Sequence, residues 1–146
     1  MLFRSGRVTA DPSVVVHALY RVHNGDKYYE AAVPTTPSGK DVVIPFDATT
    51  FAETGGAFVT GIALANLETT AVNVTCTAKD AAGNPIANAI PARTLPARGH
   101  WADFNFPALV GKRGIIECTS PGNISGVSLR FSGAGSFFSL PVSVLR

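Results

Sequence analysis

The sequence predicts a single all-β domain, an antiparallel β-sandwich of about nine or ten strands. Three observations support this fold class. Apolar and polar residues alternate cleanly over residues 71–79, and such a period of two is typical of a half-buried strand. Asn24-Gly25 separates two alternating runs, which is a strong hairpin signal. Finally, 14 glycines, 10 prolines and only 15% charged residues favour short strands joined by tight turns over helices.

Length and charge narrow the classes of protein to which the chain can belong. Its 146 residues fit one domain with a core of its own, in which residues 1–13 form a weakly patterned N-terminal segment. The net charge of +2, with scattered basic residues, argues against a nucleic-acid partner. No apolar run reaches the length of a membrane span. Because the first residues lack the apolar core of a signal peptide, we expect the chain to derive from a longer precursor.

The first predicted element is a hairpin over residues 14–33, with Asn24-Gly25 as the two residues of a type I′ turn. This register opposes four pairs on one face, namely His23–Asp26, Arg21–Tyr28, Leu19–Glu30 and His17–Ala32. The other face is apolar and is predicted to point into the core, and it carries Val14, Val16, Ala18, Tyr20, Val22, Tyr29, Ala31 and Val33.

A second hairpin is predicted over residues 58–80, at the centre of the sandwich. Residues 60–65 have the small apolar side chains of a buried strand, and a polar turn at 66–69 leads into the alternating run. The side of that run predicted to face the core consists of Val72, Val74, Cys76 and Ala78.

The remaining elements follow from turn signals. Proline lacks the amide that a central strand needs, so Pro45 is expected to end a short strand and Pro91 to restrict its strand to a sheet edge. A short helical turn is expected around residues 107–109. The predicted strands are 42–44, 85–95, 100–104, 114–119, 124–131 and 137–144, with polar or glycine-rich loops between them.

The two cysteines are both predicted to face inward. Cys76 lies on the apolar side of its strand, and Cys118 shares parity with Ile116. One interpretation is a disulfide that bridges the two sheets, as in antibody domains. The other is a pair of buried free thiols that pack as small hydrophobic side chains. The disulfide would imply an oxidising compartment.

The order of several motifs from residue 28 to the C-terminus resembles that of a known module. The motifs are EAAVP (30–34), VIPFD (43–47), FVTGIALAN (58–66), DAAGN (80–84), LPARGHWADF (95–104), KRGIIECTS (112–120) and ISGVSLRFSGAGSFFSLPV (124–142). They resemble an Ig-like β-sandwich module, often C-terminal, of large secreted or surface proteins of soil bacteria. The resemblance implies an accessory module of an exported protein and carries over no catalytic or ligand residues.

We therefore expect a non-catalytic module for adhesion, assembly or display. Its partners would be other domains of a larger exported protein or identical subunits. One route to assembly is strand donation to a neighbouring copy by the N-terminal segment, which contains Leu2, Phe3 and Val8. The alternative is that this segment pairs within its own domain or frays.

Two other functions are weighed against this expectation. Carbohydrate recognition is the first alternative, because sugar rings pack on aromatic faces, and its candidate residues are Arg21, Tyr28, Glu30 and Trp101. A hydrolase is the third hypothesis, although no GxSxG nucleophile motif accompanies His100. We expect no cofactor and no metal, because His17 and His23 lie roughly 20 Å apart along one strand.

Overall fold

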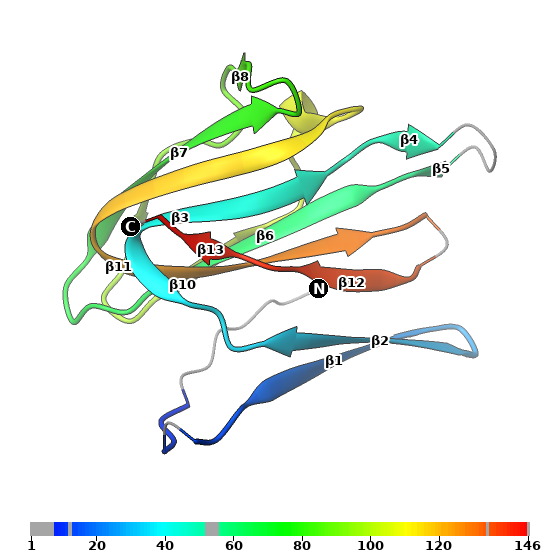
Figure 1. Ribbon diagram of the computed structural model, residues 1–146. Coiled ribbons are helices and arrows are strands. Elements are labelled where there is room, and N and C mark those ends of the chain that lie inside the picture. The colour runs from blue at the N-terminus through cyan, green and yellow to red at the C-terminus, as the bar shows by residue number, and fades with distance from the viewer. Residues whose placement is uncertain (1–7, 12, 52–55, 134, 146) are drawn as a thin grey trace.

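The computed structural model describes residues 8–11, 13–51, 56–133 and 135–145 (Figure 1). The described chain consists of β-strands and one 3-10 helix, and its strand pairings are antiparallel, which confirms the all-β class. No described helix has the length and apolar character needed to cross a membrane. The strands are β1 (His17–Asn24), β2 (Lys27–Pro34), β3 (Ser38–Asp47), β4 (Thr50–Phe51), β5 (Gly56–Ala57), β6 (Val59–Asn66), β7 (Val72–Asp80), β8 (Pro85–Ile86), β9 (Arg93–Leu95), β10 (His100–Asp103), β11 (Arg113–Phe131), β12 (Phe137–Leu140) and β13 (Ser143–Val144), and the 3-10 helix is η1 (Pro107–Leu109).

The longest described strand, β11, pairs with β3, β6, β7 and β12 and so connects the two halves of the largest sheet (Figure 1). Its first half lies between β3 and β7, and its second half pairs with β6 and β12. The sequence predicted two strands here with a loop between them, but the structure has one curved strand of 19 residues. Pro121 is tolerated because the ladder to β3 shifts register between Thr119 and Ile124, where a missing amide breaks no regular pairing.

The strand at residues 42–44 is likewise longer than predicted. Strand β3 continues through Pro45, which lies opposite Ile115 of β11. On the other side of β3, the described residues that pair with it are those of β13, which lie opposite Val42 and Val43. Pro45 therefore lies where β3 has an open edge, and an open edge does not require the amide that proline lacks.

The predicted hairpin over residues 58–80 is wrong in its pairing, although both of its strands exist. Strand β6 pairs with β10 and β11, whereas β7 pairs with β8, β9 and β11. The side-chain amide of buried Asn66 donates to the carbonyls of Thr70 and Pro96, 2.8 Å away in each case, and its oxygen accepts from the Glu68 amide. These bonds fix the connection between β6, which pairs with the second half of β11, and β7, which pairs with the first half.

The main apolar cluster lies on one side of β11 and is built from the even-numbered positions of several strands. Alternation places these side chains on a common side, as predicted for β7, where Val72, Val74 and Ala78 are buried and Cys76 is partly buried. The buried members are Val42, Ile44, Phe46, Ala48, Ile62, Leu64, Val72, Val74, Ala78, Ala89, Ile90, Leu95, Phe106, Leu109, Ile116, Cys118, Ile124 and Val142.

Cys76 and Cys118 form the predicted disulfide, but it does not bridge two sheets. The two residues lie directly opposite each other on the paired strands β7 and β11, with their Cα atoms 4.1 Å apart. This separation is close to the spacing of about 4.5 Å between non-hydrogen-bonded neighbours in an antiparallel ladder. The bond therefore joins adjacent strands within one ladder.

A second apolar cluster lies on the opposite side of β11, under the β1–β2 hairpin. Buried Ala31 and Val33 of β2 pack with Leu129 of β11 and Phe137 of β12. The Ser139 hydroxyl of β12 donates to the Ala32 carbonyl at 2.8 Å, which holds β2 beside β12. The hairpin thus packs against the end of β11, where the odd-numbered side chains point away from the main cluster.

The register of this hairpin differs from the prediction. The observed pairs include His23 with Tyr28 and Arg21 with Glu30, so the two turn residues are Gly25 and Asp26. Gly25 has a φ of +60°, as the first turn residue of a type II′ turn requires. The slip is by two positions, and each side chain therefore stays on its predicted face.

The inner face of β1 is less buried than predicted. Tyr20 and Val22 are partly buried against the second cluster, but Ala18 is exposed; before the strand begins at His17, Val16 is partly buried and Val14 is exposed. Among the described residues, the hairpin packs on the sheet through β2 and through Tyr20 and Val22 of β1, while Ala18 and part of Tyr20 line a groove.

Candidate functional site

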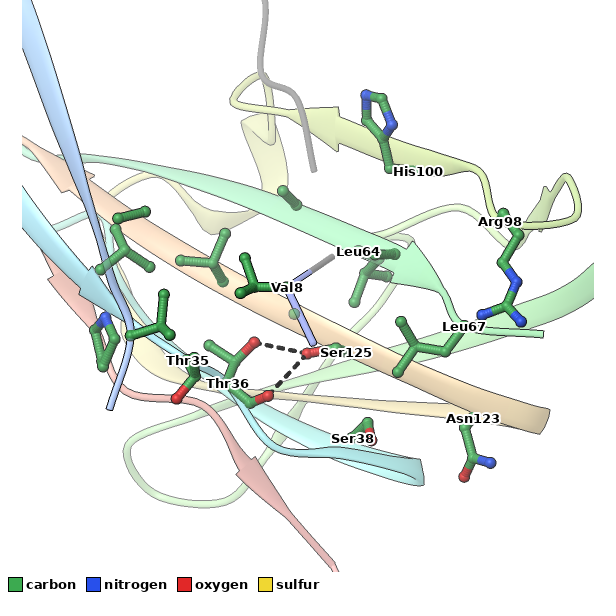
Figure 2. Close-up of a pocket in the computed structure, with 18 of the residues that line it drawn as sticks. Val8, Thr35, Thr36, Ser38, Leu64, Leu67, Arg98, His100, Asn123 and Ser125 are labelled. Atoms are coloured by element: carbon green, nitrogen blue, oxygen red, sulfur yellow. Dashed lines mark hydrogen bonds between the residues drawn. The ribbon is translucent and has the colours of Figure 1, made fainter. Parts of the chain in front are cut away.

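The groove has a volume of 720 Å³ and lies between the β1–β2 hairpin and strands β6 and β11 (Figure 2). One wall is formed by Val16, Ala18 and Tyr20 of the hairpin side. The opposite wall includes Ala63 and Ala65 of β6 and Val127 of β11. Protein sites that hold ligands typically measure about 300–1,000 Å³ and have mostly apolar walls, and this groove fits that description.

The far wall follows from the alternation of β6 and β11. Ile62 and Leu64 of β6 belong to the main cluster, so the intervening Ala63 and Ala65 point to the opposite side, into the groove. Ala63 and Ala65 are successive groove-facing positions of β6, and each contributes only a methyl group to this wall. The small side chains leave open volume that larger residues would fill.

One end of the groove is closed by a polar contact between the β2–β3 connection and β11. The hydroxyls of Thr36 and Ser125 lie 2.6 Å apart, and the Ser125 hydroxyl also donates to the Pro37 carbonyl at 2.9 Å. Figure 2 shows the bonds between Ser125 and Thr36 beneath Val8, which lies among the lining residues. These bonds fix the distance between the hairpin and β11 at this end.

Charged and polar residues line the groove near the end of β6. The Glu68 carboxylate accepts a hydrogen bond from the backbone amide of Asn123 at 2.7 Å. The Glu68 backbone carbonyl accepts one from the backbone amide of Arg98 at 3.0 Å. Arg98 has a φ of +53°, a conformation that few residues other than glycine adopt. With His100, these residues give an apolar groove a polar rim.

Three of the four residues predicted for ligand binding come together on the outer face of the hairpin, which faces away from the groove. Arg21 Nη2 lies 2.5 Å from Glu30 Oε1, and Arg21 Cζ lies 5.8 Å from the centre of the Tyr28 ring. The Tyr28 ring stacks on His23 with 4.6 Å between ring centres, and Tyr28 is 64% exposed. We call Arg21, His23, Tyr28 and Glu30 the outer-face cluster.

Trp101, the fourth predicted residue, is not part of this cluster. It lies on β10 opposite Leu64 and packs against the main apolar cluster. The guanidinium carbon of Arg93 lies 4.3 Å from the centre of its ring, and Phe106 contacts it edge-on. Its partial burial and its aromatic neighbour give Trp101 a packing role at the side of the core.

The described residues provide no group of three or more His, Cys, Asp or Glu that could hold a metal ion. Among the described residues, the carboxylates of Asp11 and Asp80 have a clearly shifted pKa, and neither residue lines the groove. The Asn84 amide lowers the pKa of Asp80, and the Ser13 hydroxyl lowers that of Asp11, because each donates a hydrogen bond to the ionised carboxylate. Both shifts belong to turn structures.

The groove was not predicted from the sequence. Its walls come from residues 16–20, 63–65 and 125–129, which lie far apart in the chain and meet only after folding. A weak signal is present, since alanines occupy several positions that alternation assigns to buried faces. A comparison of the chain with protein-family models, with curated proteins and with solved structures gives no match.

Proposed function

We propose that the chain is a non-catalytic, Ig-like β-sandwich module of an exported bacterial protein, and that it serves assembly or adhesion by binding a partner polypeptide in the groove. The observation that carries this proposal is the open inner face of β1. Ala18 and Tyr20 of β1, and Val16 just before it, follow the alternation of a buried strand face, yet they line a groove. Covering apolar surface contributes about 25 cal/mol per Å², so a partner that fills the groove gains binding free energy.

Two further features support a sandwich architecture and export from the cell. Apolar clusters on opposite sides of β11 are what a sandwich with an additional hairpin layer would produce. The Cys76–Cys118 disulfide supports export, because such bonds are rare in reducing compartments. The resemblance of the sequence to modules of secreted and surface proteins agrees with both features.

Photo-crosslinking in cells tests the proposal. A photo-reactive amino acid at Ala18, in the full-length exported protein, is expected to yield a covalent adduct with a polypeptide, because Ala18 is exposed on the groove wall. The same group at Thr77, which is exposed on β7, serves as the control. Adducts that are absent at Ala18, or equally abundant at both positions, would contradict the proposed function.

Carbohydrate recognition is the second candidate, favoured by the outer-face cluster. An exposed aromatic ring beside a guanidinium and a carboxylate can stack on a sugar and bond its hydroxyls. If this function holds, a glycan array identifies a ligand, and Tyr28→Ala weakens its affinity about tenfold or more in titration calorimetry. His17→Ala, an exposed change on the same strand pair, should leave the affinity unchanged. An array without hits contradicts this candidate.

A further inference from the structure

The Cys76–Cys118 disulfide joins two residues that differ in exposure. Cys118 lies on β11, between β3 and β7, and is 1% exposed. Cys76 lies on β7 and is only partly buried. A reagent in solution therefore has better access to Cys76 than to Cys118. Access is one of the factors that decide which sulfur of a disulfide is attacked.

The partial exposure of Cys76 coincides with a gap along the outer edge of β7. Strand β9 pairs with residues 72–74 and β8 pairs with residues 78–79. No described strand pairs with residues 75–77 at this edge, whereas β11 occupies the other edge. The line from Cys118 to Cys76 leads away from β11, toward the gap. A thiolate that enters the gap thus approaches the Cys76 sulfur from the side opposite to its bonded partner, as displacement at sulfur requires.

Arg93 gives Cys76 a cationic neighbour. It lies opposite Val74 in the β7–β9 ladder and is therefore diagonal to Cys76, a distance that a long side chain can span. Arg93, Trp101 and Cys76 line one small pocket, and Arg93 Nε is buried without a hydrogen-bond partner among the described residues. The Asp103 carboxylate lies 3.8 Å from Arg93 Nη2, too far for a hydrogen bond, and balances this charge only in part. A cation at this position stabilises a thiolate at Cys76.

The ladder between β7 and β11 holds the two cysteines together whether or not they are bonded. Residues 75–80 pair with residues 114–119 without a register shift. The neighbouring Val74, Ala78 and Ile116 are buried in the main cluster. Facing residues at non-hydrogen-bonded sites of an antiparallel ladder lie about 4.5 Å apart without any bridge. Opening and re-forming the bond therefore require no rearrangement of the strands.

We propose that Cys76 is a thiol-exchange site, at which a low-molecular-weight thiol opens the disulfide while the protein stays folded. The thiolate attacks Cys76 Sγ, a new S–S bond forms there, and the bond to Cys118 breaks. The Cys118 sulfur leaves with the electron pair and takes up a proton from water. The product carries the small thiol as a mixed disulfide on Cys76 and a free, buried thiol at Cys118.

A second molecule of the thiol completes the reduction. Its thiolate attacks the sulfur of the small thiol in the mixed disulfide, so that the two small molecules leave joined by a disulfide. Cys76 departs as a thiolate, and Arg93 favours this departure. The site lies on β7, outside the groove, so the inference stands independently of the proposed function.

Reduced glutathione, added to the purified full chain under native conditions, tests the inference. The reaction is stopped with acid, free thiols are blocked, and the peptides are mapped by mass spectrometry. We expect glutathione on Cys76 and a free thiol at Cys118. Trp101 is the only tryptophan of the chain and lines a pocket with Cys76, so its fluorescence is expected to change as the bond opens.

Two single-cysteine variants compare the sulfurs directly. Cys118→Ser leaves the Cys76 thiol, and Cys76→Ser leaves the Cys118 thiol, in the same ladder. With glutathione disulfide as the reagent, the folded Cys118→Ser variant should react at least about tenfold faster than the folded Cys76→Ser variant. In denaturing urea the two rates should become similar, and circular dichroism verifies that each variant is folded before the reaction.

The inference is overturned if glutathione is found on Cys118, if the two folded variants react at equal rates, or if the wild-type bond opens only under denaturing conditions. A rate of opening that rises with urea in parallel with the rate of global unfolding would also overturn it. If a single-cysteine variant fails to fold, peptide mapping of the wild-type reaction still decides, because it needs no substitution.

Discussion

Reduction of the Cys76–Cys118 disulfide is expected to lower the melting temperature by about 10 °C. The bond joins residues 42 positions apart, and closing such a loop restricts the unfolded chain by about 4 kcal/mol in the chain-entropy model. For a domain of this size, each kcal/mol shifts the melting temperature by about 2–4 °C. Circular dichroism melts with and without reductant measure the shift.

The folded structure should survive reduction at room temperature, because the main apolar cluster around the bond remains. The double variant Cys76→Ala/Cys118→Ala, melted without reductant, controls for effects of the reducing agent and should show a similar loss. An unchanged melting temperature would contradict this prediction. Finding two reactive thiols in denatured, unreduced protein from an oxidising compartment would show that the bond does not form there.

Ile116→Ala is expected to destabilise the protein by about 2–5 kcal/mol. Ile116 is 0% exposed and lies on β11 between Ile44 of β3 and Ala78 of β7, which oppose it across the two ladders. Truncating it removes apolar contacts and leaves a cavity that both neighbouring strands constrain. Urea unfolding measures the difference in the free energy of unfolding.

The adjacent Ile115 provides a matched control, because it has the same side chain on the opposite side of the same strand. It is only partly buried and lies outside the main cluster, so Ile115→Ala should cost about 1 kcal/mol. Equal losses in the two variants would mean that the two sides of β11 are equally buried, contrary to the structure.

The local alternation of apolar and polar residues was sufficient to predict many strands and their faces. Residues 72–78 present their even-numbered side chains to the core, and Cys118 shares a side with Ile116, as predicted. Even where the register of the β1–β2 hairpin slipped, the faces stayed correct, since a shift of two positions preserves parity. Alternation is a steric property of an extended chain and can be recognised without knowing its neighbours.

Strand partners, in contrast, depended on contacts between distant residues. Strands β6 and β7 follow each other in the chain, yet both pair with β11, and this arrangement placed the disulfide within one ladder. The effect of Pro121 depended on a register shift relative to β3, which has no local signature. The groove depended on how far the hairpin approaches β6 and β11. Alternation assigned Val16 and Ala18 to a buried face, but only the packing of separate strands established that this face stays open.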